Sequence, residues 1–155
     1  MKIRYIVAGI VQKGDLIILG RQIKKRSPYP GTWVTPGGGV EDVEKAKILF
    51  DSAQYNHPFF HEELRRELRE ELGVEVNNIH CIIPTYRKVP REGDVIKEGK
   101  RMHYYFLEYL CDYASGEVRA ADDVADAQWF HKSDLSKIPL SPPSQEMYRE
   151  LGWIQ

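Results

Sequence analysis

Residues 59–74, FFHEELRRELREELGV, constrain the fold of this chain more than any other segment. Leu64, Leu68 and Leu72 recur every four residues, and this spacing places them along one side of an α-helix. Gly73 follows the last leucine, and a glycine at that position commonly ends a helix. The segment therefore predicts a helix over residues 59–72 whose leucine stripe needs a second layer to pack against.

The same helix carries acidic side chains away from the leucine stripe. Glu67, Glu70 and Glu71 share one face, and Glu63 extends that face by one turn. Like charges at these spacings cost roughly a few tenths of a kcal/mol per pair, and Arg66 offsets only part of this repulsion. A divalent cation such as Mg2+, which prefers carboxylate oxygens, would offset the rest. A solvated acidic face is the alternative, and the segment alone leaves both interpretations open.

The rest of the chain alternates apolar runs with turn signals. Residues 3–11 and 16–21 are rich in β-branched residues and flank QKGD, which predicts a β-hairpin. Residues 24–42 are dense in Pro and Gly and predict a long loop with a short extended piece around Trp33 and Val34. The other predicted elements are a short helix at 43–54, strands near 74–85, 101–112 and 126–131, and a last short helix near 144–151.

Helices that interrupt a mixed set of strands indicate one layered domain of the α/β (α+β) class over residues 1–155. The net charge is −1, so no overall field attracts nucleic acid or a membrane, and we expect neither as a partner. The N-terminal apolar run is too short to span a bilayer. Cys81 and Cys111 lack metal-site spacing and are interpreted as reduced thiols, so we expect a cytoplasmic protein.

A second motif, TPGGGVEDVE, lies upstream at residues 35–44. Its three glycines would let the backbone approach a ligand closely, although an ordinary tight turn is the alternative. Together the two segments resemble the box of the Nudix hydrolase superfamily, G-x5-E-x7-R-E-U-x-E-E-x-G-U, where U is aliphatic. The second half matches at every specified position: Arg66, Glu67, Leu68, Glu70, Glu71, Gly73 and Val74.

The first half of the box matches at Gly38 and Glu44, but the spacing between the halves differs. The family pattern has seven residues between its first glutamate and its arginine, whereas 21 separate Glu44 from Arg66 here. The chain thus carries an insertion at about residues 45–58. Because this segment contains Ile48 and Phe50, we expect a lid or side wall over the pocket, or a segment packed on the domain or on a second subunit, which would make a homodimer.

The resemblance implies an α/β/α sandwich around a mixed β-sheet and Mg2+-dependent hydrolysis, with Mn2+ as an alternative ion. By resemblance, Glu67, Glu70 and Glu71 ligate the metal together with a Gly38 carbonyl, Glu67 or Glu70 acts in catalysis, and Arg66 holds the carboxylates. The expected site also includes candidate bases and candidate substrate-binding residues. Asp122 and Asp123 are candidate bases or metal ligands, with Asp123 preferred, and the substrate-binding candidates are Gly37, Gly38, Gly39 and Trp33.

The implied substrate is a nucleoside diphosphate derivative. A MutT-like pyrophosphohydrolase of nucleoside triphosphates, including modified ones, is preferred over a nucleotide-sugar or ADP-ribose pyrophosphatase, because no further motif typical of the latter is apparent. A nucleotide-binding or RNA-binding module without turnover is an alternative of another class, as is an isomerase acting on a diphosphate ester. The retained box glutamates favour the hydrolase.

Overall fold

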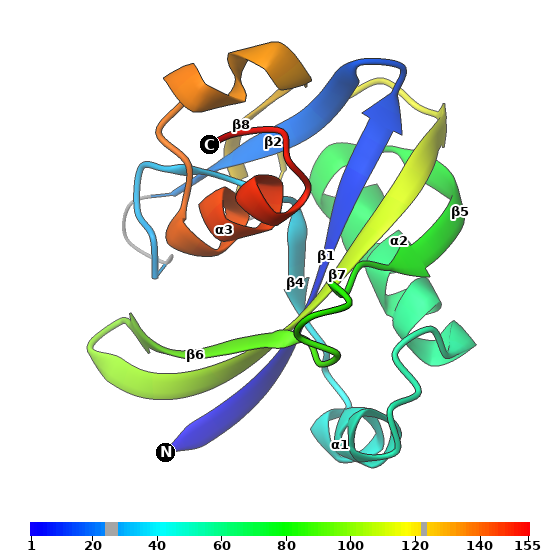
Figure 1. The fold of residues 1–155 in the computed structure, drawn as a ribbon, viewed down its shortest axis with the longest axis vertical. Helices are drawn as coiled ribbons and strands as arrows, with labels where there is room; N and C mark the ends of the chain where they lie inside the picture. Colours follow the sequence, from blue (N-terminus) through cyan, green and yellow to red (C-terminus); the bar gives the residue numbers. More distant parts are fainter. Residues whose placement is uncertain (24–27, 122–123) are drawn as a thin grey trace.

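The computed structural model describes residues 1–23, 28–121 and 124–155. Its strands are β1 (Lys2–Lys13), β2 (Leu16–Gln22), β3 (Trp33–Val34), β4 (Gly37–Gly39), β5 (Glu75–Cys81), β6 (Arg91–Lys97), β7 (Lys100–Ser115) and β8 (Val124–His131). Its helices are α1 (Val43–Asp51), α2 (Pro58–Leu72), the 3-10 helix η1 (Lys132–Lys137) and α3 (Pro142–Glu150). Within the described residues these eight strands form one sheet (Figure 1).

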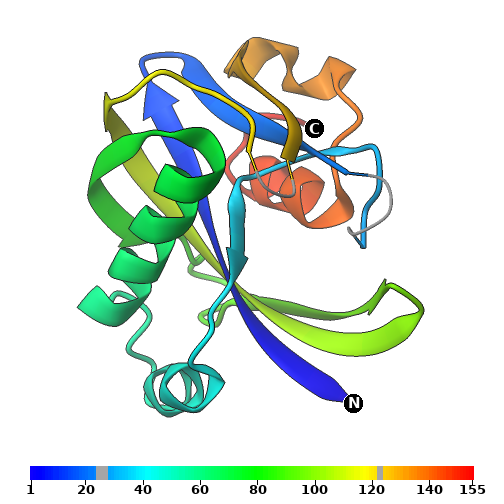
Figure 2. The same cartoon turned by 180° about the vertical axis from the view of Figure 1, so that it is seen from behind.

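The two long strands β1 and β7 run parallel through the centre of the sheet (Figure 1). β2 and β4 pair antiparallel with β1, and β8 pairs antiparallel with β2. β5 and β6 both pair antiparallel with β7, at opposite ends of that strand. A mixed sheet between helices confirms the predicted fold class, and α2 and α3 lie on different sides of β1 and β7 in both views (Figures 1 and 2).

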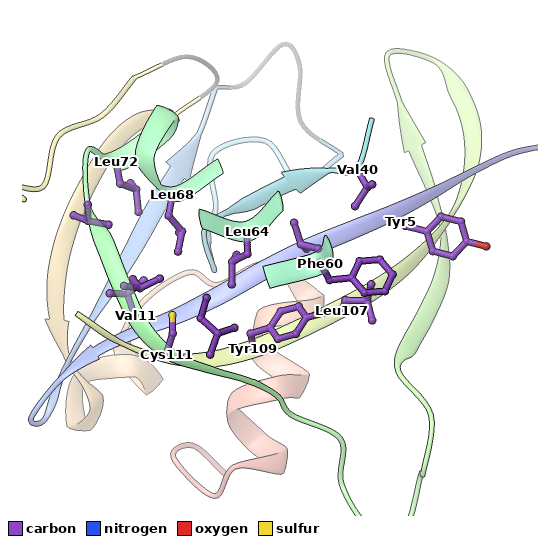
Figure 3. Close-up of a cluster of buried hydrophobic side chains, with 14 of the residues drawn as sticks. Tyr5, Val11, Val40, Phe60, Leu64, Leu68, Leu72, Leu107, Tyr109 and Cys111 are labelled. Atoms are coloured by element: carbon purple, nitrogen blue, oxygen red, sulfur yellow. The ribbon is translucent and has the colours of Figure 1, made fainter. Parts of the chain in front are cut away.

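The leucine stripe of α2 packs on the sheet as predicted. Leu64, Leu68 and Leu72 are fully buried, in one cluster with residues of β1, β5 and β7 (Figure 3). Gly9 of β1 permits this approach, because a Cβ atom there would lie 3.2 Å from both terminal methyl carbons of Leu64. Gly73 ends the helix with φ = 72°, a left-handed conformation that suits glycine. Burial of this stripe fixes the distance between helix and sheet.

The start of α2 lies one residue before the predicted start. Pro58 occupies the first turn, where a missing backbone N–H costs little. His57 precedes it, and its Nδ1 accepts a hydrogen bond from the Phe59 backbone N–H at 3.0 Å. Pro58 therefore begins α2, after the segment that follows α1.

Two strands were absent from the sequence-based prediction. β4 is too short and too rich in glycine to show a strand pattern. β6, with the sequence REGDVIK, carries four charged residues and a glycine, and it forms because β7 extends beyond the end covered by β5. The strand predicted at 74–85 ends at Cys81, before Pro84.

The insertion forms α1 and packs on the α2 side of the sheet. Its Ala46 and Leu49 are buried, and the Phe50 ring lies 5.3 Å from that of Tyr5 and 4.8 Å from that of Tyr105. Tyr5 and Tyr105 are paired in the sheet register and point to one face. Ile48 stays exposed and is the apolar residue on which the homodimer alternative depends. The segment thus packs on its own domain, whereas its part in a homodimer stays a prediction.

Both cysteines are free thiols, Cys111 buried and Cys81 partly buried. Burial raises the pKa of the Cys81 thiol to about 12 and that of Cys111 to about 12, so neither is a thiolate near neutral pH. Among the described residues, no helix combines the length and the apolar character needed to cross a bilayer.

Candidate active site

A cavity of about 340 Å³ opens on the face of the sheet opposite the leucine stripe of α2. Register explains its walls: Arg4, Ile6 and Ala8 of β1 alternate with residues that point toward α2, and their partners on β7 point the same way. The lining residues come from eight parts of the chain: Arg4, Ile6, Ala8, Gln22, Pro28, Tyr29, Val34, Thr35, Gly37, Gly38, Gly39, Glu41, Glu67, Glu71, Lys97, Tyr104, Phe106, Glu108, Ser141, Pro143 and Ser144.

The glycine strand β4 forms one wall and lies closer to β1 than a side chain would allow. A Cβ atom on Gly37 would lie 1.9 Å from the Val7 carbonyl oxygen and 2.7 Å from the Ala8 Cα. Real Cβ atoms essentially never approach heavy atoms within 3.0 Å. Any larger residue at Gly37 would therefore displace β4 from β1, so the glycine serves close backbone packing.

The other two glycines of β4 make room for charged side chains on its two faces. A Cβ on Gly38 would lie 2.5 Å from the Glu67 carboxylate, and one on Gly39 would lie 2.0 Å from Arg4 Nη2. Successive residues of a strand point to opposite faces, so the carboxylate and the guanidinium lie on opposite sides of the same strand. The structure thus places a carboxylate and a guanidinium within one cavity.

Glu67 and Glu71 are the box glutamates that line the cavity. The Glu67 side chain is only 13% exposed and is hydrogen bonded to Glu71. Burial raises the pKa of Glu67, and the charge of Glu70 raises it further, against the opposing effect of Arg66. Two carboxyl groups in contact need a proton or a cation between them, and carboxylate oxygens are the donors that hard divalent cations prefer. The donor set therefore fits such an ion.

Arg66 gathers the other carboxylates of the helix. Its guanidinium donates to Glu63 at 2.7 Å and to Glu70 at 3.2 Å, and lies 3.3 Å from Glu67. The hydrogen bond to Glu63 is the main cause that raises the pKa of Arg66, and burial opposes it. Glu70, half exposed, therefore lies at Arg66 and does not line the cavity. Among the described residues, no three His, Cys, Asp or Glu side chains converge as metal ligands would.

The first half of the box is arranged differently from the sequence match. Glu44 lies in the first turn of α1 and is exposed, and it is not part of the cavity lining. Glu41 lines the cavity instead and lies 4.0 Å from Arg66. The local signal for Glu41 was its position two residues after the glycine strand, in the segment that joins β4 to α1.

Trp33, a predicted substrate-binding residue, is not among the residues that line the cavity. The Trp33 ring packs edge-on against Phe130 at 4.9 Å, and the Arg21 guanidinium lies 5.6 Å from the Trp33 ring centre. The lining includes Val34 and Thr35 of the same segment but not Trp33. Asp123, the preferred base, and Asp122 lie outside the described residues, so their role stays a prediction.

The cavity also contains charged residues that sequence reasoning missed. Glu108 of β7 is 4% exposed, and its carboxylate accepts a hydrogen bond from Arg91 Nη2 at 3.2 Å. Arg91 also donates to Glu146 at 2.8 Å and to Glu150. Arg4 and Lys97 add positive charge to the lining. The available signal for Glu108 was a lone acid within the apolar run YYFLEYL.

A chain of hydroxyl groups attaches α3 to this site. Ser144 Oγ accepts a hydrogen bond from the Thr35 backbone N–H at 3.0 Å, and Thr35 Oγ1 lies 3.1 Å from Ser144 Oγ. Thr35 Oγ1 also lies 2.8 Å from the hydroxyl of Tyr148, which is fully buried. These bonds fix the start of α3 beside the residues that lead into β4.

Comparison with known proteins places these features in context. A family model described as NUDIX domain matches residues 60–151, more than half of the chain. The nucleoside triphosphatase NudI of Klebsiella pneumoniae is 27% identical over 156 residues, covering 99% of this chain and all of that protein. NudI of Escherichia coli gives the same identity and coverage.

Two solved structures show the shared fold. A MutT NUDIX hydrolase from Burkholderia pseudomallei matches with a TM-score of 0.69 at 22% identity, over 97% of this chain and 99% of that chain. The NUDIX domain of NrtR from Shewanella oneidensis, solved in complex with ADP ribose, matches with a TM-score of 0.61 at 13% identity, over 98% of this chain and 86% of that chain.

The buried Glu108 predicts a specific pH dependence of stability. Burial raises the pKa of Glu108 to about 7, from an ordinary 4.5, with repulsion from Glu150 adding to the effect and Arg91 opposing it. The folded protein therefore keeps a proton that the unfolded chain releases, and the free energy of unfolding falls as pH rises from about 4.5 to 7. Relative to Glu108→Gln, we expect the native protein to lose about 3 kcal/mol between pH 4.5 and 8.

Urea denaturation of both proteins at half-unit pH steps measures this difference. Parallel pH profiles for the native protein and Glu108→Gln would show that Glu108 has an ordinary pKa in the folded state.

Proposed function

The chain belongs to the NUDIX domain family and is a hydrolase that acts on phosphoanhydride bonds, and on this premise we propose that it cleaves nucleoside triphosphates, including modified ones, to monophosphate and pyrophosphate. The observation that carries this proposal is the glycine strand β4, with Glu67 against one face and Arg4 against the other. A polyphosphate chain bound with a divalent cation needs groups of both signs within reach. The proposed ion is Mg2+, with Mn2+ as the alternative.

The carboxylates of α2 are the proposed ligands of this ion. Glu67 and Glu71 face the cavity and would hold it, and Glu70 is the third oxygen donor of the predicted set. Arg66 is proposed to keep these side chains in position, since it contacts Glu63, Glu67 and Glu70. When bound, the ion would neutralise phosphate charge and lower the pKa of a water molecule next to it.

The remaining lining suits a nucleotide. The basic side chains of Arg4 and Lys97 line the cavity and would contact phosphate oxygens. Ile6, Tyr104 and Phe106 form an apolar wall on which a flat base would pack. A wall of this kind next to charged groups favours a nucleotide over inorganic pyrophosphate. The name of the NudI relatives, nucleoside triphosphatase, supports the same substrate class.

An ADP-ribose or nucleotide-sugar pyrophosphatase is the second candidate, because a structural neighbour is solved with ADP ribose. A panel of deoxynucleoside triphosphates, ADP-ribose and GDP-mannose distinguishes the two candidates. We expect pyrophosphate release from at least one triphosphate in Mg2+ and none after addition of EDTA. The highest kcat/KM on ADP-ribose or GDP-mannose would shift the proposal to the second candidate, and no turnover on any substrate would favour a binding module.

The metal-holding role predicts the effect of neutralising single carboxylates. Glu67→Gln and Glu71→Gln each remove a charge facing the cavity, so we expect kcat to fall at least about a hundredfold at saturating Mg2+. Glu62→Gln on the same helix is the control, because Glu62 is exposed and pairs with Arg65 at 2.6 Å. Nearly native kcat in both cavity variants would refute the assigned ligands.

The phosphate-binding role of Arg4 predicts a change in KM. Replacing its guanidinium by the neutral amide in Arg4→Gln should raise KM about tenfold or more, since charge-assisted bonds to phosphate are lost. Arg101→Gln is the matched control, because Arg101 is exposed and pairs with Asp94 at 3.2 Å. Steady-state kinetics with one triphosphate measure KM for both variants. Equal KM values for Arg4→Gln and Arg101→Gln would contradict a phosphate contact at Arg4.

A further inference from the structure

One buried carboxylate in the cavity is not explained by the charges around it. Glu108 is 4% exposed, and one of its oxygens, Oε1, accepts the hydrogen bond from Arg91. No described residue donates to its second oxygen, Oε2. Among the described residues, the buried side-chain nitrogen and oxygen atoms without a partner are Arg87 Nε and Arg91 Nε. Oε2 is not among these atoms, and Glu108 is one of the residues that line the cavity.

Neutralising Arg91 does not require Glu108. Glu146 and Glu150 of α3 also bond to this guanidinium, and Arg87 bonds to Glu150, so two guanidinium groups face three carboxylates. Burying a further carboxylate costs free energy unless its oxygens find donors. Glu108 also lies in a strand whose neighbours on the cavity face, Tyr104 and Phe106, are aromatic. A ligand that donates to Oε2 would supply the missing partner.

The sheet register shows which part of a nucleotide reaches this oxygen. Gly37, Ala8 and Glu108 form one row across β4, β1 and β7, and Gly39, Ile6 and Phe106 form the next row on the same face. Because the side chain of Ala8 is small, it leaves space in this row between the glycine strand β4 and Glu108. If the phosphates of a nucleotide bind at β4 and its base packs on Phe106, the edge of the base lies toward Glu108.

Three hydroxyl groups near this part of the cavity are already hydrogen bonded. Thr35, Ser144 and Tyr148 use their hydroxyl groups on one another. Glu108 adds a second carboxylate oxygen, Oε2, to the acceptors of this region. An ionised carboxylate only accepts hydrogen bonds, so it attracts an N–H group and repels a carbonyl oxygen.

We propose that Glu108 selects the base of the substrate, because its cavity-facing oxygen accepts a hydrogen bond from an exocyclic amino group. The substrate class is then a nucleotide of cytosine, adenine or guanine, distinguished from the uracil or hypoxanthine counterpart. This inference rests on the proposed function, since it assumes that a nucleotide occupies the cavity. Glu108 acts as a specificity residue and takes no part in the attack on phosphorus.

Binding of nucleoside monophosphates tests the proposal without turnover. Calorimetric titrations of the full chain with Mg2+ at pH 8 would compare three matched pairs: dCMP with dUMP, dAMP with dIMP, and dGMP with dIMP. We expect the amino-bearing member of at least one pair to bind about tenfold or more tightly, as a hydrogen bond to a charged group would provide. Equal affinities within all three pairs, or no binding at all, would overturn the proposal.

Two variants separate base contact from a general effect on the Arg91 network. Glu108→Gln keeps the shape but removes the charge, so the preference should fall below about threefold. Glu146→Gln removes another partner of Arg91 outside the cavity and should keep the native preference. An unchanged preference in Glu108→Gln, or the same loss in both variants, would overturn the proposal. If Glu108→Gln does not fold by circular dichroism, the comparison of pairs in the native protein still decides.

Pyrophosphate release measured in parallel keeps the two proposals apart. Hydrolysis of triphosphates without any preference for an amino group would refute base selection by Glu108 and leave the proposed function standing. A clear preference among monophosphates without hydrolysis of any triphosphate would refute the proposed function and leave the base contact standing.

Discussion

Close packing of the glycine strand β4 against β1 is the constraint on which the site depends. The two backbones approach so closely that a methyl group at Gly37 would overlap the Val7 carbonyl. This approach leaves room for Glu67 on one face of β4 and for Arg4 on the other. Opposite charges can then serve one ligand from two sides of a single strand. A side chain on any of the three glycines would separate these groups or displace the strand.

The position of Glu67 also depends on burial of the leucine stripe, since both lie on α2. Leu64 packs against Gly9 of β1, and this contact sets how closely the helix approaches the sheet. Leu68, adjacent to Glu67, is fully buried and fixes the rotation of the helix about its axis. Apolar packing thereby holds a largely buried carboxylate against β4, at an electrostatic cost that a bound cation would offset.

Charge is organised differently at the two ends of the cavity. Near α2, Arg66 binds several carboxylates whose mutual repulsion it only partly relieves. Near α3, Arg91 links Glu108 of β7 to Glu146 and Glu150 of α3. These ion pairs hold α3 to the strand that carries Glu108. The first arrangement suits exchange of a cation, whereas the second suits a rigid wall.

Local patterns in the sequence were sufficient for α2, its end at Gly73, the first hairpin and the family resemblance, because helix period, turn residues and a contiguous box are properties of neighbouring residues. The same patterns did not predict β6, and they did not show that Glu41 lines the cavity or that Glu70 lies at Arg66. They also placed Trp33 in the site, whereas its ring packs on Phe130. Only the tertiary structure decided that Arg4, Lys97 and Glu108 share the cavity, because pairing of β1 with β7 and of β6 with β7 joins residues far apart in the chain. The pKa of Glu108 was equally beyond the sequence, since it depends on burial, and burial exists only after those layers pack.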